Sequence, residues 1–196
     1  MLLPDCVLFP HGGLPLYIFE ERYRAMLDDA IAGSCCFAVA RLTDEETHPP
    51  LDCAAQVGTI GLVRASREGD DGTSQLLLHG VMRVRFVRWL DEKDYPYAEI
   101  EPLISHFADE SQKDAAMKTL IGAVEDTVKV LPKPVQDGIF GLLNRADDPA
   151  LLTDIVSQQF IQNADLRLKL LEELDVGRRV TMLCEALAEL KFEPEE

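Results

Sequence analysis

The stretch LPDCVLFPHGGLPLYIFEERYRAMLDDAI, residues 3–31, decides how this chain begins to fold. It holds two short apolar runs, CVLF (6–9) and LPLYIF (14–19), separated by a Pro/Gly cluster that is typical of a tight connection. In the segment that follows (20–32), apolar residues recur with the period of a helix. We therefore expect two short strands and then one amphipathic helix. The expected inner face of that helix consists of Tyr23, Met26, Leu27, Ala30 and Ile31.

Further β segments follow this helix up to about residue 104. They are rich in β-branched and aromatic residues, and GDDGT (69–73) has the composition of a hairpin turn. Gly80 interrupts the longest segment, and a glycine inside a strand pattern usually marks a bulge or a bend. Together these short strands predict a small β-barrel, closed or nearly so. The segments are CCFAVARL (35–42), VGTIGLVRA (57–65), QLLLHGVMRVRFVRWL (75–90) and YPYAEIEPLI (95–104).

The apolar period changes to that of helices from about Asp109 onward. A first stripe stops at Pro132, a short helix is expected over 135–143, and Asp148 followed by Pro149 has the pattern of a helix N-cap. We therefore expect an α+β protein, with a β-barrel lobe over 1–108 and an all-helical bundle lobe over 109–196. The apolar stripes contain Met117, Leu120, Ile121, Val124, Val128, Leu131, Leu166, Leu170, Leu171, Leu174, Val180, Leu183, Cys184, Leu187 and Leu190.

Composition limits the classes of partner. The chain has 196 residues, of which 47% are hydrophobic, and a formal net charge of -16. Nucleic acids and anionic membranes would approach against this field, so neither is expected as a partner. No apolar run approaches the ~18 residues of a membrane-spanning helix, and the start has no signal-peptide pattern. We expect a cytoplasmic protein.

Motifs that carry catalysis or bind cofactors are absent from the sequence. There is no GxSxG, no GxxxxGK[ST] and no GxGxxG. The histidines are dispersed, and the five cysteines include no CxxC pair, so we expect no metal, no cofactor and no disulfide framework. The cysteines are expected to be core thiols, and acidic pairs such as Asp28–Asp29 are expected to lie on solvated surface. These histidines and cysteines are His11, His48, His79, His106, Cys6, Cys35, Cys36, Cys53 and Cys184.

The basic cluster of the sequence is Arg83, Arg85 and Arg88, on the longest β segment. In so acidic a chain, cross-strand ion pairs are a better interpretation than an anion site. Alternation along the strand places three other side chains inward. They are Met82, Val84 and Phe86.

The opening stretch resembles the N-terminal domain of the ATP-dependent Lon protease, and is closest to family members that consist of this domain alone. VGTIGLVRA, LLLHGVMRVRF, DDPALLTDIV and LLEELDVGRRVTMLCEAL are similar to later parts of the same domain, so the resemblance runs to about Leu190. The pattern L-P-x-x-V-L-F-P-x-x-x-L-P-L-x-I-F-E-x-R-Y-R-x-M is matched by Leu3, Pro4, Val7, Leu8, Phe9, Pro10, Leu14, Pro15, Leu16, Ile18, Phe19, Glu20, Arg22, Tyr23, Arg24 and Met26.

The resemblance implies a PUA-like β-barrel lobe joined to a helical bundle. In Lon this region helps to recognise polypeptide substrates and to organise the hexamer, whereas ATP hydrolysis and peptide cleavage belong to later domains. The given sequence contains neither the Walker ATPase nor the Ser-Lys peptidase domain. We therefore expect no enzymatic activity, because activity follows from a site and not from a family label.

The leading hypothesis is a non-catalytic module, an adaptor or regulatory factor, that binds polypeptides or unfolded protein segments. The alternative for its aromatic candidates is that they are buried in the core and contact no partner, because the helix must cover the barrel. The alternative from another class is a small-molecule sensor that uses the barrel or a cleft; RNA binding, suggested by a PUA-like fold, is opposed by the net charge. The sequence leaves the oligomeric state open. The candidate contact residues are Tyr17, Phe19, Tyr23 and Tyr97, with Arg22 and Arg24 as polar anchors.

Overall fold

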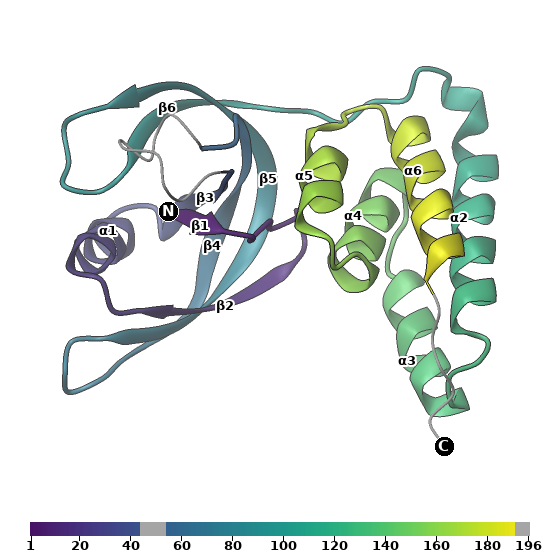
Figure 1. The fold of residues 1–196 in the computed structure, drawn as a ribbon, viewed down its shortest axis with the longest axis horizontal. Helices are drawn as coiled ribbons and strands as arrows, with labels where there is room; N and C mark the ends of the chain where they lie inside the picture. The colour runs from purple at the N-terminus through teal and green to yellow at the C-terminus, as the bar shows by residue number, and fades with distance from the viewer. Residues whose placement is uncertain (44–53, 191–196) are drawn as a thin grey trace. The chain divides into compact units, whose positions relative to one another are not determined.

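The chain divides into a sheet unit and a helical unit. The computed structural model describes residues 1–43 and 54–190. Contacts separate the compact units Met1–Leu103 and Ile104–Glu196, a division that falls a little before residue 108. The first unit combines strands with one helix, and the second is helical (Figure 1). The predicted α+β class is confirmed.

The sheet unit contains a six-stranded mixed sheet and helix α1 (Glu21–Ala32). The strand order is β1-β3-β4-β5-β2, and β6 pairs with β5. Among the strands of the described residues, β1 alone runs parallel to its neighbour, β3; the other pairings are antiparallel. In Figure 1 the sheet curves round α1. The strands are β1 (Leu2–Pro4), β2 (Gly13–Ile18), β3 (Cys36–Leu42), β4 (Val57–Glu68), β5 (Ser74–Leu90) and β6 (Tyr97–Pro102).

The expected strand over residues 6–9 is wrong. This segment joins β1 to β2 without entering the sheet, and Val7, Leu8 and Phe9 are all buried. Three consecutive buried side chains do not fit the alternation of a sheet strand with one solvated face. The Leu8 carbonyl instead accepts a 2.6 Å hydrogen bond from the Thr59 hydroxyl. The sequence reading also missed β1, which lies just before this segment.

The irregularity expected at Gly80 is confirmed. A Cβ atom on Gly80 would lie 2.1 Å from the carbonyl oxygen of Phe9, so only glycine fits this approach. The β4–β5 register shifts here, because Gly61 pairs with Gly80 whereas Ile60 pairs with Met82. Val81 is the extra residue of this bulge.

The bulge also changes which side chains of β5 face inward. Arg83 is buried with 3% of its surface exposed, whereas Met82 is 39% exposed. The expectation that Met82 faces inward is therefore wrong: after the bulge, Arg83 and Val84 are both buried, so burial does not alternate at this point of β5. Val84 is fully buried and Phe86 is half-buried, as expected.

Helix α1 covers the sheet with the predicted stripe, except at its C-terminal end. Tyr23, Met26 and Leu27 are buried in a core that includes Ile18, Phe37, Val39, Leu76 and Leu78. Ala30 is half-buried, and Ile31 is 47% exposed, so the expectation for Ile31 is wrong. Periodicity gives the angular position of a side chain on a helix but not how far along the axis the sheet extends.

The helical unit contains the helices that the apolar stripes predicted. Its core includes Leu120, Val124 and Val128 on one helix and Leu183 and Leu187 on another, none of them more than 1% exposed. The predicted Asp148 cap is confirmed, because its carboxylate accepts hydrogen bonds from the amides of Ala150 and Leu151. The helices are η2 (Glu110–Gln112), α2 (Lys113–Val128), α3 (Lys133–Leu143), α4 (Pro149–Phe160), α5 (Ala164–Glu172) and α6 (Val176–Glu189).

A buried ion pair joins two helices of this unit. Arg179 of α6 is fully buried and lies 3.2 Å from the carboxylate of Asp154 on α4. Its guanidinium also donates a 3.0 Å hydrogen bond to the hydroxyl of Ser105. One arginine thus positions both helices and the segment that precedes them.

Candidate functional site: an aromatic pocket beside an acidic hollow

A pocket of about 500 Å³ opens in the sheet unit between α1 and the paired ends of β5 and β6. We call it the aromatic pocket, because aromatic rings from four segments converge on it. Apolar side chains dominate the lining, and Asp29 and Lys93 bring charge to it. The lining residues are Met1, Leu2, Met26, Asp29, Ala30, Gly33, Ser34, Cys36, Phe37, Ala38, Phe86, Trp89, Lys93, Tyr95, Pro96, Tyr97, Ala98 and Ile100.

A second bulge in β5 builds the aromatic wall. Residues three apart on a regular strand point to opposite faces, yet the rings of Phe86 and Trp89 stack with centroids 5.0 Å apart. The β5–β6 register shifts between Phe86 and Arg88, which leaves Val87 as the extra residue. The bulge therefore returns both rings to the pocket face, opposite Ile100 and Ala98 of β6.

The other face of the same hairpin carries ion pairs. Arg85 contacts Glu101 at 2.7 Å, and Arg88 contacts Glu99 at 2.6 Å. The hydrogen bond from Arg88 holds the pKa of the Glu99 carboxyl below its ordinary value. Cross-strand pairing of these two arginines is confirmed, so neither is a free anion-binding group.

Gly58 makes room for the floor of the pocket. A Cβ atom there would lie 2.3 Å from the Val39 carbonyl oxygen and 2.8 Å from the ring of Phe86. The glycine thus allows β3, β4 and the Phe86 ring to approach more closely than any other residue would.

An ion pair fastens the β5–β6 connection to α1 at the pocket mouth. The Asp29 carboxylate accepts hydrogen bonds from the Lys93 ammonium at 2.7 Å and the Tyr95 hydroxyl at 2.6 Å. The Lys93 bond, followed by the Tyr95 bond, lowers the pKa of Asp29. The same contact raises the pKa of Lys93, while burial and then Asp29 raise the pKa of Tyr95. The sequence reading assigned Asp29 only to solvated surface, because nothing local indicates a partner so distant in the chain.

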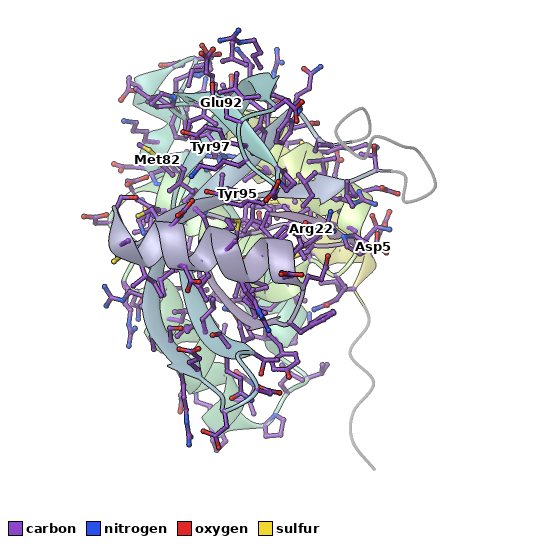
Figure 2. All side chains as sticks on the ribbon, turned by 90° about the vertical axis from the view of Figure 1, so that its left-hand side faces the viewer. Asp5, Arg22, Met82, Glu92, Tyr95 and Tyr97 are labelled. Atoms are coloured by element: carbon purple, nitrogen blue, oxygen red, sulfur yellow. The ribbon has the colours of Figure 1, made fainter. Side chains whose placement is uncertain are left out.

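A polar hollow of about 370 Å³ adjoins the aromatic pocket and shares Asp29, Lys93 and Tyr95 with it. We call it the acidic hollow. Figure 2 shows Glu92, Tyr95 and Tyr97 on the same side of α1. Its lining is Ala25, Asp29, Asp91, Glu92, Lys93, Asp94 and Tyr95.

The α-amino group of Met1 also borders the aromatic pocket. It donates a 2.6 Å hydrogen bond to the carbonyl of Ala38. Burial, with a smaller effect of the Arg22 charge, lowers the pKa of this amine to about 5. At neutral pH it is therefore an uncharged donor.

Tyr97 is the one residue of the predicted set that lines the aromatic pocket. It is 40% exposed, and its ring meets that of Tyr95 edge-on at 6.4 Å. Tyr17 and Phe19 lie elsewhere on the sheet unit, 53% and 61% exposed, with their rings stacked at 5.9 Å. Tyr17 lines a separate shallow hollow on β2, β4 and β5.

The other predicted residues do not join the pocket. Tyr23 is 3% exposed, and its hydroxyl donates to the carbonyl of Leu2, so its side chain belongs to the core. Arg22 lies over the Tyr23 ring and contacts Glu20 at 2.7 Å. The guanidinium of Arg24 lies beside Gly72 in the β4–β5 turn.

The pocket residues that the sequence reading missed are chiefly Phe86, Trp89 and Ile100. Phe86 was expected to face inward, but Trp89 could be placed beside it only with knowledge of the bulge. One available signal was that Trp89 is the single tryptophan of the chain.

Metal-ligand clusters, membrane-spanning helices and cysteines are the features of the described residues that could indicate another kind of site. Within 1–43 and 54–190, no cluster of three His, Cys, Asp or Glu is placed to hold a metal ion, and no helix has the length and apolar content for a bilayer crossing. The cysteines in those ranges form no disulfide and are half-buried. The expected core position holds in part for Cys6, which packs against the core of the sheet unit. Cys36 lines the aromatic pocket. Cys53 and His48 lie outside the described residues.

The family model for the substrate-binding domain of ATP-dependent protease La (Lon) matches residues 1–189. The chain belongs to this family. The chain spans about a fifth of the length of the curated relatives it matches: it is 27% identical to the Lon protease of Azorhizobium caulinodans over 179 residues, which cover 91% of this chain and 21% of that protein.

Solved structures share the fold of this chain. The N-terminal domain of the Mycobacterium avium complex Lon protease superposes with a TM-score of 0.75 at 19% identity, over 96% of each chain. A Lon N-terminal domain protein from Xanthomonas campestris gives a TM-score of 0.64 at 22% identity, over 97% of each chain. These likenesses establish the fold of the chain.

Proposed function

We propose that this domain is a non-catalytic polypeptide-binding module whose aromatic pocket takes an apolar side chain of an extended or unfolded segment. The observation that carries the proposal is the pocket itself, in a chain of a substrate-binding family. Phe86, Trp89, Tyr95 and Tyr97 supply ring surface there, and Ile100 adds an exposed aliphatic side chain. Burial of one large apolar side chain contributes about 1.5 to 3 kcal/mol.

The strand beside the pocket offers a way to hold the backbone of the same segment. Within the described residues, β6 pairs with β5 alone, so its second edge is open. An extended peptide that adds to such an edge gains main-chain hydrogen bonds, while a neighbouring pocket selects its side chains. Tyr97, Ala98 and Ile100 belong to β6 and to the pocket lining, which places both contacts together.

Tyr17 and Phe19 form a second proposed contact, away from the pocket. Both rings are exposed and stacked, which suits a long unfolded segment that touches the sheet unit at two places. Arg22 and Arg24 remain weaker candidates as polar anchors, because Arg22 already pairs with Glu20. Tyr23 is left out of the proposed site, since its side chain is buried.

Trp89 provides the test, because the single tryptophan lies in the proposed site. Its fluorescence should change saturably on titration with a tryptophan-free apolar peptide. In isothermal titration calorimetry, reduced, carboxymethylated lactalbumin, which stays unfolded, should bind saturably, and native lactalbumin should not. Ile100→Ala should weaken binding about tenfold through lost apolar contact. Ile104→Ala is the matched control, because Ile104 is 80% exposed and lies outside the pocket lining. Equal affinities for the unfolded and native forms would contradict the proposal.

The non-catalytic part of the proposal has its own assay. The chain of residues 1–196, incubated with ATP and casein, should release neither phosphate nor peptides above a buffer control. Turnover that co-purifies with the protein and is lost in an engineered variant would contradict it.

A small-molecule sensor is the second candidate, favoured by the size of the pocket. Ligand pockets usually measure about 300 to 1,000 Å³ and are mostly apolar with a few polar groups. The aromatic pocket has such a volume, with Asp29, Lys93 and Tyr95 at its edge. A saturable Trp89 response to a low-molecular-weight cell fraction, with none to unfolded polypeptide, would favour this function over the first.

A further inference from the structure

We infer that the segment bound by this domain carries a basic residue beside its apolar anchor, so that the apolar side chain enters the aromatic pocket and the ammonium or guanidinium group enters the acidic hollow. This inference rests on the proposed function and narrows it to one class of polypeptide. The geometric basis is that the two hollows share Asp29, Lys93 and Tyr95. A ligand that fills the pocket therefore lies next to the carboxylates.

The acidic hollow carries an excess of negative charge. Four carboxylates line it, those of Asp29, Asp91, Glu92 and Asp94, against the one ammonium of Lys93, which gives a formal charge of 1 − 4 = −3. Lys93 is already engaged by Asp29 at 2.7 Å. Within residues 1–43 and 54–190, the other three carboxylates form no ion pair, and all three side chains are exposed.

Nearby basic groups do not cancel this charge. Arg88 attracts Glu92 over a longer range, but its guanidinium pairs with Glu99 at 2.6 Å on the opposite face of the hairpin. The Met1 amine borders the aromatic pocket and is uncharged at neutral pH, as its lowered pKa shows. The hollow therefore keeps its negative charge when the protein is free.

The Lys93 ammonium is an example of a cation bound where the aromatic pocket and the acidic hollow meet. Its ammonium contacts Asp29 and lies 5.9 Å from the centroid of the Tyr95 ring. A basic residue of a bound segment would meet the carboxylates of Asp91, Glu92 and Asp94 in the hollow that Tyr95 also lines. Such complementary charge raises the association rate and selects among partners of equal apolar content.

Another acidic part of the sheet unit lacks this arrangement. Glu68 and Asp70, at the β4–β5 turn, are exposed carboxylates that line neither the pocket nor the hollow. Glu21, in the first turn of α1, also lies outside both. These three residues supply a control that changes net charge without changing the proposed site.

The test uses three peptides with one central Phe-Leu pair and either Lys, Gln or Glu at the flanking positions, titrated against Trp89 fluorescence at low salt. The Lys peptide should bind about tenfold more tightly than the Gln peptide, and the Glu peptide more weakly than both. Added salt should reduce this difference, because the carboxylates are exposed. The triple variant Asp91→Asn, Glu92→Gln, Asp94→Asn should bind the Lys and Gln peptides alike. The control triple variant Glu21→Gln, Glu68→Gln, Asp70→Asn should keep the preference.

The outcomes separate this inference from the function on which it rests. Equal binding of all three peptides would overturn the charge preference and leave polypeptide binding in place. A Lys preference that survives in the Asp91/Glu92/Asp94 variant would overturn the assignment to the acidic hollow. Failure of all three peptides and of unfolded lactalbumin to bind would overturn the proposed function itself.

Discussion

The two units place the carboxylates of their ion pairs differently. In the helical unit, Arg179 and Asp154 form a pair that is 0% and 5% exposed, and the pair joins two helices to a preceding segment. In the sheet unit, the pair at the pocket mouth, Lys93 and Asp29, is 43% and 51% exposed. In the helical unit a buried ion pair thus positions the helices. In the sheet unit, glycines and β-bulges determine how the strands pack. Its carboxylates remain at the surface, where a ligand can reach them.

Arg179→Ala is expected to have the largest effect, because it leaves the Asp154 carboxylate buried without its partner. We expect the free energy of unfolding to fall by about 3 to 5 kcal/mol. Urea unfolding followed by circular dichroism at 222 nm would measure it, since α2 to α6 supply most of the helical signal.

Two further variants sharpen this prediction. Arg178→Ala is the matched control: its side chain is 75% exposed, and it should change stability by less than about 0.5 kcal/mol. Replacing the pair by Arg179→Met with Asp154→Leu should recover much of the loss, because apolar residues of similar volume often substitute for a buried ion pair. If Arg179→Ala cost no more than Arg178→Ala, the contrast between the units would fail.

Leu27→Ala tests the sheet unit, whose core is apolar at this position. Truncation of a buried leucine should cost about 2 to 5 kcal/mol through the cavity that it leaves. Trp89 fluorescence during urea unfolding reports on this unit, because the tryptophan belongs to β5. Ile31→Ala, on the same helix but 47% exposed, should cost much less. Similar losses for both variants would contradict the assignment of the buried face.

Asp148→Ala should have a smaller effect in the helical unit. It removes the carboxylate that accepts the first two amides of α4, a loss of about 1 kcal/mol. Asp147→Ala is the control, because it removes an exposed neighbouring carboxylate without touching the cap. Circular dichroism melts of the two variants should differ, and equal melting temperatures would show that the cap contributes nothing measurable.

The smallest effect is expected at the exposed ion pair of the pocket mouth. The lowered pKa of Asp29 means that the native protein binds this proton less readily than the unfolded chain does. The resulting stability is present above the ordinary carboxyl pKa of 3.8 and is lost as the pH falls through the lower native value. The free energy of unfolding, followed by Trp89 fluorescence, should therefore depend less on pH between about pH 5 and 3 in the Asp29→Asn variant than in the wild type. Asp28→Asn should not change this dependence. Identical profiles for wild type and Asp29→Asn would contradict this role.

The sequence predicted the elements whose signals are local. The α1 stripe at Tyr23, Met26 and Leu27 and the Asp148 cap depend on residues within a few positions of one another, and both are confirmed. The 6–9 segment was misassigned because the same short apolar sequence occurs both in strands and in buried connections. Its fate depends on Thr59 and Gly80, which lie far along the chain.

The site was predictable only in part, since Tyr97 lines the pocket while Tyr17 and Phe19 lie apart from it. Family membership, the α+β class and the helix positions follow from the sequence by itself. They rest on patterns formed by residues that are close together in the chain, such as an apolar period or a helix cap. Tertiary structure alone decided the position of the pocket. The extra residue Val87 turns Phe86 and Trp89 to one face, and the contact of Asp29 with Lys93 brings carboxylates beside the rings. A bulge reverses which side chains of a strand point to each face, and the composition of the strand does not reveal it. An ion pair between distant residues leaves no periodic pattern in the sequence. Both features are therefore set by the register of the paired strands.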